Sequence, residues 1–153
     1  MHGAAFLFVL LTVMAGATLQ NQPPNGLSPF VGNWTANLSK SKLNPNYRIQ
    51  GATLQFVVAG DTVTIISSTV NAAGQEQHGT DIFITDGEEH PIARSPGVIT
   101  VVRWISTHIL ETVAKKEGKI AATGTYEVSA DGKTLTARMV TADFEQVVVF
   151  ERR

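Results

Sequence analysis

The chain has 153 residues, of which 43% are apolar and 16% charged, and its formal net charge is −1. This length fits a single domain, and the apolar content excludes an extended disordered chain. A net charge near zero provides no field that would attract nucleic acid or an anionic membrane surface, so neither is an expected partner. Because the sequence has no cysteine, disulfides, thiolate metal sites and cysteine nucleophiles are excluded.

The first 17 residues are typical of a secretory signal peptide. Ala4 to Ala15 is almost continuously apolar, and Ala15-Gly16-Ala17 provides a small-x-small cleavage site. The apolar run is shorter than the roughly 20 residues that span a bilayer. We therefore expect a secreted or periplasmic mature protein, cleaved after Ala17 and without stable membrane insertion. The alternative is an N-terminal helix that stays buried or anchors the chain.

Residues 18–29 are polar and contain Pro23, Pro24 and Pro29, which predicts a flexible linker. From Phe30 onward short β-like runs alternate with turn signals, and no window shows a sustained helical period. We predict about nine strands, within a range of about 8–10, and a loop or short helical turn at residues 39–46. The predicted strands occupy residues 30–37, 49–59, 62–70, 79–85, 98–104, 108–114, 119–128, 134–140 and 145–151.

Sequential strands joined by short turns form a meander, and its edges stay exposed unless the sheet closes on itself. We therefore predict an all-β fold, an antiparallel up-and-down barrel over residues 30–153 that is monomeric. The alternative is an open sandwich with Greek-key connections. That arrangement needs long crossovers, and the only long connections lie at residues 71–78 and 86–97.

An F-x-G-x-W pattern, formed by Phe30, Gly32 and Trp34, stands at the start of the first predicted strand. By alternation these three residues share one face, and in the last run Arg152 shares a face with Phe150. We expect Trp34 to close one end of the barrel, with Arg152 stacked on its ring as a cation–π contact. The alternative is that Arg152 is a solvated residue.

These residues, followed by Asn37-Leu38-Ser39-Lys40-Ser41-Lys42 and later by the run from Val128 to Thr136, resemble a family of small secreted bacterial proteins described as lipocalin-like. The resemblance covers Phe30 to Arg153 and implies a calycin-type barrel. It implies little about activity, since the family is largely of unassigned function. The T-D-Y motif of animal lipocalins is not convincingly present, so no animal-lipocalin ligand is transferred to this chain.

The favoured function is that of an exported binding protein that holds a small hydrophobic or amphipathic molecule in the barrel cup. Barrels of this size leave an interior that side chains fill or a small ligand occupies. Small residues on the presumed inward faces, Ala122, Gly124 and Ala137, leave room for a ligand.

Three residues are candidates for ligand binding. Arg103 and Glu111 lie on adjacent predicted strands, where antiparallel pairing brings them opposite each other. We expect a partly buried ion pair that either orients a polar head group from the inward side or only fixes the strand register. Trp104, Val98 and Val102 are the alternative occupants of the inward face of that strand. Tyr126, on the inward face of its strand, is the third candidate.

No pattern points to catalysis, since the chain has neither a G-x-S-x-G elbow nor a phosphate-binding loop. His90 stands beside Asp86, Glu88 and Glu89, a group that suits a metal ion, but a solvated acidic turn is the favoured interpretation. We therefore predict no catalytic residue, no metal site and no cofactor. Two alternatives stay open: a ligand-free barrel that acts as an envelope interaction module, and an enzyme with its active site in the cup.

Overall fold

The computed structural model describes residues 28–153, which form an all-β fold of ten antiparallel strands and one 3-10 turn. The predicted signal peptide at 1–17, and all of the predicted linker before Ser28, lie outside the described residues. Within the described part, no helix has the length and apolar character needed to cross a membrane. The elements are β1 (Gly32–Ala36), η1 (Leu38–Lys40), β2 (Ile49–Ala59), β3 (Thr62–Asn71), β4 (Glu76–Ile84), β5 (Asp86–Pro91), β6 (Val98–Ser106), β7 (Ile109–Lys116), β8 (Lys119–Val128), β9 (Thr134–Thr141) and β10 (Glu145–Arg152).

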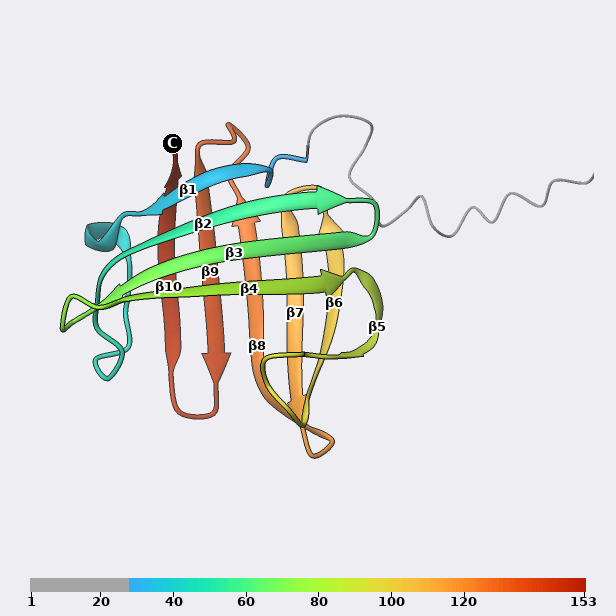
Figure 1. Cartoon of the computed structure of the whole chain (residues 1–153). Coiled ribbons are helices and arrows are strands. Elements are labelled where there is room, and N and C mark those ends of the chain that lie inside the picture. Colours follow the sequence, from blue (N-terminus) through green and yellow to red (C-terminus); the bar gives the residue numbers. More distant parts are fainter. Residues whose placement is uncertain (1–27) are drawn as a thin grey trace, which may run out of the picture.

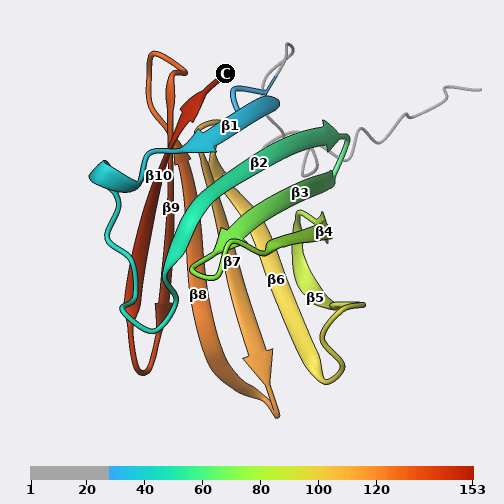
Figure 2. The same ribbon diagram turned by 60° about the vertical axis from the view of Figure 1, so that its left-hand side comes forward.

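The strands form a nearly closed up-and-down barrel, as the meander pattern predicts. The order across the sheet is β4-β3-β2-β1-β10-β9-β8-β7-β6-β5, so the first and last strands pair with each other. β1–β4 run across the direction of β6–β10 (Figure 1), and the turned view shows the two halves of the sheet facing each other (Figure 2). No ladder joins β4 to β5, which leaves these two strands as the edges of the sheet.

β5 is the strand that the sequence analysis missed. It reads Asp-Gly-Glu-Glu-His-Pro, and most of these residues are uncommon in strands. β5 pairs only with β6, and its register shifts between Asp86 and Glu89. An edge strand tolerates a proline and charged side chains because it needs hydrogen bonds on one side only. Strand propensity alone therefore could not identify it.

The inward faces of the strands change from apolar to polar along the barrel. On β3 the inward residues are Val63 and Ile65, which are buried, followed by Ser67 and Thr69, which line a cavity. The apolar core therefore occupies one end of the barrel only. Its members are Phe30, Trp34, Phe56, Val63, Ile65, Val102, Trp104, Leu110, Val128, Leu135, Val148 and Phe150.

Trp34 and Arg152 meet at this closed end. The Trp34 side chain is fully buried and its Nε1 donates to the Phe30 carbonyl oxygen at 2.9 Å. The guanidinium carbon of Arg152 lies 4.1 Å from the centre of the Trp34 ring, and the guanidinium also donates to backbone carbonyls before β1 and between β8 and β9. Gly32 has φ +130°, and a Cβ there would lie 2.7 Å from Arg152 Nη1. Any other residue at position 32 would displace Arg152.

Candidate ligand-binding cavity

A cavity of about 690 Å³ occupies the part of the barrel that the core leaves free. Its inner end is apolar, where Leu54, Val148 and Phe150 adjoin the core. Its outer part includes the exposed side chains of Tyr47 and Arg48 at the start of β2. The volume lies within the range of pockets that hold small molecules.

Small inward residues leave this space open. Ala137 lines the cavity and pairs across the ladder with Tyr126, which also lines it. Gly124 pairs with Met139, another lining residue, and therefore belongs to the same inward face. Gly124 also lies against Thr112 of β7, because a Cβ there would be 2.5 Å from the Thr112 hydroxyl oxygen.

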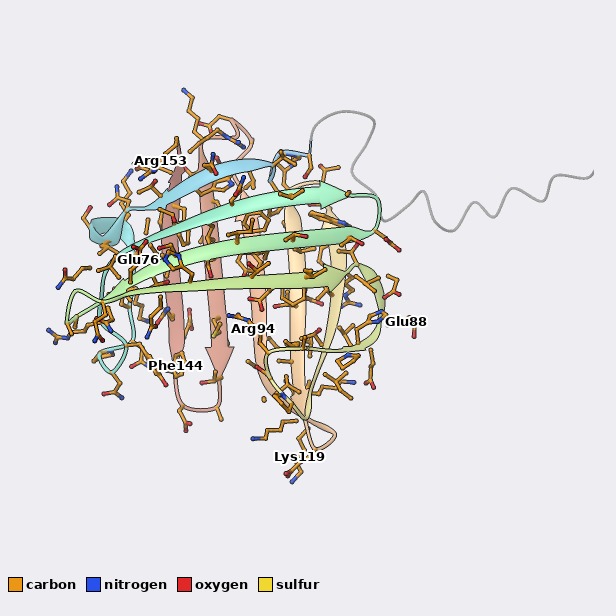
Figure 3. The ribbon with its side chains drawn as sticks, viewed as in Figure 1. Glu76, Glu88, Arg94, Lys119, Phe144 and Arg153 are labelled. Carbon is orange, nitrogen blue, oxygen red and sulfur yellow. The ribbon has the colours of Figure 1, made fainter. Side chains whose placement is uncertain are left out.

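Arg94 reaches the cavity from the loop between β5 and β6. Its Nε donates to Asp81 Oδ1 at 2.9 Å, and its Nη2 donates to Asp81 Oδ2 at 2.7 Å. Asp81 pairs with the buried residue Ile65 and so belongs to the inward face of β4. Figure 3 shows Arg94 just below β4. This bidentate ion pair ties the β5–β6 loop to β4 on the side of the barrel where the two edge strands lack a ladder.

Gly79 provides the space in which the Arg94 guanidinium lies. A Cβ at Gly79 would be 2.5 Å from Arg94 Nη1 and 3.0 Å from the hydroxyl oxygen of Ser67. Nη1 is the nitrogen that Asp81 does not engage. It lies on the inner face of β4 among cavity-lining residues and is available to a ligand.

Tyr126 contributes a hydroxyl group from the opposite wall, on β8. Its ring packs edge-on against Phe56, with the ring centres 5.5 Å apart. Burial raises the pKa of Tyr126 to about 12, and the negative charge of Asp81 acts in the same direction. The hydroxyl therefore stays protonated at neutral pH and is able to donate a hydrogen bond.

The ionisable side chains that line the cavity include Arg48, Arg94 and His78 but no Asp or Glu. His78 is largely exposed and lies 3.8 Å from Glu76. Arg94 is half-exposed and paired with Asp81, just outside the lining, whereas Arg48 forms no ion pair within residues 28–153. The lining therefore favours a ligand that carries a negative charge or hydrogen-bond acceptors.

Arg103 and Glu111 form an ion pair, with Nη2 and Oε1 2.7 Å apart, but they do not face the cavity. The expectation of an inward Arg103 is wrong because the neighbours on either side of it, Val102 and Trp104, are buried in the core. Alternation along β6 then directs Arg103 outward. Of the three candidate ligand-binding residues, only Tyr126 lies in the cavity lining.

His90 pairs with Asp86 alone, its Nε2 lying 2.9 Å from Oδ2. The pKa of Asp86 is lowered, first by the hydrogen bond from the Glu88 amide and then by His90. Among residues 28–153 no group of three or more His, Asp or Glu side chains is arranged to hold a metal ion. These residues lie on the edge strand β5 rather than in the turn that the sequence suggested.

No pattern in the sequence pointed to Arg94, Asp81 or Gly79 as site residues. Arg94 lies in a loop, and its contact with β4 joins segments that are not neighbours in the sheet. The inward position of Asp81 is visible only once its alternation with Ile82 is assigned, and Ile82 is 68% exposed. On β4 the apolar Ile82 faces outward and the charged Asp81 faces inward, which is the reverse of the usual alternation. A pattern of apolar and polar residues therefore could not identify the inner face of this strand.

The fold and the cavity together define a ten-stranded, nearly closed up-and-down β-barrel with an open cup. Wild-type fluorescent protein UnaG is similar in structure, with a TM-score of 0.54 and 22% identity over 81% of this chain and 97% of that one. A Schistosoma mansoni fatty acid binding protein in complex with arachidonic acid has a TM-score of 0.55 and 15% identity over 82% and 97% of the two chains. The fatty acid transporter REP1-NXSQ has a TM-score of 0.55 and 12% identity over 83% and 98%.

No protein-family model matches the sequence, and no curated protein matches it. At these identities the similarity to solved structures establishes the fold alone. The function must therefore be argued from the cavity.

Proposed function

We propose that this protein binds a small anionic amphipath, a molecule with an apolar chain and a negatively charged head group, in the barrel cup. The observation that carries the proposal is a cavity of about 690 Å³ with an apolar inner end and, among its charged side chains, only cationic ones. An apolar chain would be held by removal of its surface from water, and the head group by Arg48, Arg94 or Tyr126.

The structural neighbours support this class of ligand. One was solved with arachidonic acid, and another is described as a fatty acid transporter. Both share the barrel architecture seen here, at 15% and 12% identity with this chain.

The proposal is tested by equilibrium binding of a series of straight-chain carboxylates and the primary alcohols of equal length. We expect the carboxylates to bind more tightly than the alcohols and affinity to rise with chain length, by roughly 0.8 kcal/mol per buried methylene group. Native mass spectrometry of protein purified from its own host then identifies the natural ligand. Absence of binding by every chain length, with no co-purified molecule, would contradict the proposal.

We also propose that the protein functions after export, as the apolar segment before Ala17 indicates. Intact-mass measurement of protein from the host's extracytoplasmic fraction should then show a chain that begins at Thr18. A mass that retains Met1–Ala17 would contradict export by cleavage.

A further inference from the structure

The Arg94 guanidinium divides its donors between the protein and the cavity. Nε and Nη2 donate to the two carboxylate oxygens of Asp81, at 2.9 and 2.7 Å. Nη1 lies against Gly79, on the inner face of β4, where both Gly79 and Arg94 line the cavity. The bidentate contact fixes the plane of the guanidinium, so Nη1 is positioned before any ligand arrives.

Gly79 is part of the same arrangement. Its backbone φ is outside the left-handed range, so the backbone does not require glycine at this position. The requirement is one of space, because a methyl group there would come within 2.5 Å of Nη1. The absence of a side chain at position 79 therefore allows Arg94 to lie flat on the inner face of β4.

Asp81 also limits how much negative charge this region accepts. Its charge contributes to the raised pKa of Tyr126, which lines the cavity from the opposite wall. A head group at Nη1 would experience the same charge at short range. Each negative charge on such a head group meets the repulsion of Asp81, so a second charge doubles that repulsion, while the cation that receives the head group is the single Arg94 guanidinium.

We propose that Arg94, seated on Gly79 and held by Asp81, receives the ligand's head group through Nη1, and that Asp81 restricts the site to head groups with one negative charge. This inference rests on the proposed function and deepens it, since it identifies the recognition residue and selects carboxylates over phosphate monoesters.

Three probes share one alkyl chain and differ in the charge of the head group: dodecanoate, dodecanol and dodecyl phosphate. Comparison of their affinities separates the contribution of the first and the second negative charge from that of the chain. Binding is measured at about pH 8, where a phosphate monoester, with a second pKa of about 6, carries two charges. We expect wild-type protein to bind dodecanoate about tenfold or more tightly than dodecanol, as a hydrogen bond to a charged group implies. Dodecyl phosphate should bind more weakly than dodecanoate.

Arg94→Met and Gly79→Ala test the recognition residue. Each substitution should weaken the binding of dodecanoate by about tenfold and leave the affinity for dodecanol nearly unchanged, because only the charged head group loses its hydrogen-bond donor. Gly79→Ala retains both charges, so its effect reports the position of Nη1 rather than the charge of Arg94. Gly51→Ala is its matched control, since a Cβ at Gly51 has no neighbour within 4 Å.

Arg103→Met is the matched control for Arg94→Met. The outer pair Arg103–Glu111 has side-chain exposures of 56% and 28%, against 53% and 26% for Arg94–Asp81, and the same 2.7 Å separation. Removal of either arginine therefore changes charge and stability alike, but only Arg94→Met should alter dodecanoate binding. The role of Arg94 would be overturned if Arg94→Met lost affinity for dodecanoate and dodecanol equally. It would also be overturned if Arg94→Met and Arg103→Met changed dodecanoate binding by the same factor.

Asp81→Asn tests the charge limit, with Glu111→Gln as its control. We expect the preference for dodecanoate over dodecyl phosphate to fall by about fivefold or more in Asp81→Asn, because the repulsion of the second charge is removed. An unchanged preference would overturn the role of Asp81. If wild-type protein binds none of the three probes, or binds dodecanol and dodecanoate equally, the proposed function fails and this inference fails with it. If wild-type protein prefers dodecanoate to dodecanol and Arg94→Met keeps the same preference, only the inference fails.

Discussion

Trp34 shows how one residue determines the closed end of the barrel. It is fully buried, donates its indole N–H to the Phe30 carbonyl, and lies beneath the Arg152 guanidinium. We expect Trp34→Ala to lower the free energy of unfolding by about 3–5 kcal/mol, the range for a buried aromatic side chain that leaves a cavity. Urea unfolding measures this change. The exposed aromatic Tyr47 is the control, since Tyr47→Ala should leave stability nearly unaltered.

The same variant separates folding from binding. The ring of Trp34 belongs to the core and is absent from the cavity lining. Folded Trp34→Ala protein should therefore retain the affinity of the wild type for dodecanoate. A selective loss of binding without loss of stability would show that the closed end contributes to the ligand site.

Tyr126 makes stability depend on pH at the alkaline end of the range. Its pKa is about 12 in the folded protein, against the ordinary value of 10.0. Between these values the unfolded chain releases the phenolic proton while the folded protein retains it. Stability is therefore complete below about pH 10 and falls as pH rises toward 12. Tyr126→Phe should remove this part of the decline in the free energy of unfolding, as measured by urea unfolding at about pH 9 and about pH 11. An equal decline between the two pH values in wild-type and variant protein would contradict the prediction.

At the level of the elements, we expect β4 and β5 to be the least protected part of the barrel, because each has a ladder on one side only. On this side an ion pair joins Asp81 of β4 to Arg94 of the β5–β6 loop. A half-exposed ion pair stabilises little, about 1 kcal/mol at most. We expect backbone amides of β4 and β5 to exchange with deuterium faster than those of β2 and β9, which are paired on both sides. Hydrogen exchange followed by NMR tests this order, and uniform protection of all four strands would contradict it.

Features that depend on residues close together in the sequence were predictable, whereas features that depend on contacts between distant segments were not. Alternation and turn signals act over a few residues, so they identified the meander, most strand boundaries and the inward face of β8, including Tyr126. β5 escaped because its residues suit an edge strand only. Alternation left two possible inward faces for β6, one with Arg103 and one with Val102 and Trp104, and only the structure shows that the second is the core face. The Arg94–Asp81 contact depends on the conformation of a loop, which no periodic pattern encodes.

For the whole molecule, an occupied cup should couple binding to stability. A ligand that binds only the folded barrel stabilises it by about 2.7 kcal/mol at a concentration of 100 times its Kd. We therefore expect dodecanoate to raise the melting temperature, by differential scanning calorimetry, in proportion to the logarithm of its concentration. Ala137→Phe, which fills part of the cavity, should abolish the shift. A shift of equal size in that variant would place the ligand outside the cup.

The ladder between β1 and β10 has a consequence for the timing of folding. The pairing of Trp34 with Arg152 joins the first and last strands of the described sequence, so the β1–β10 ladder that closes the barrel cannot form before β10 is present. On the ribosome β10 emerges after β1–β9, and the edge of β1 stays open until then. Contacts of such long sequence separation form slowly. Closure of the barrel is therefore a late and slow step, and until it is complete the unpaired edge of β1 is open to pairing with another chain.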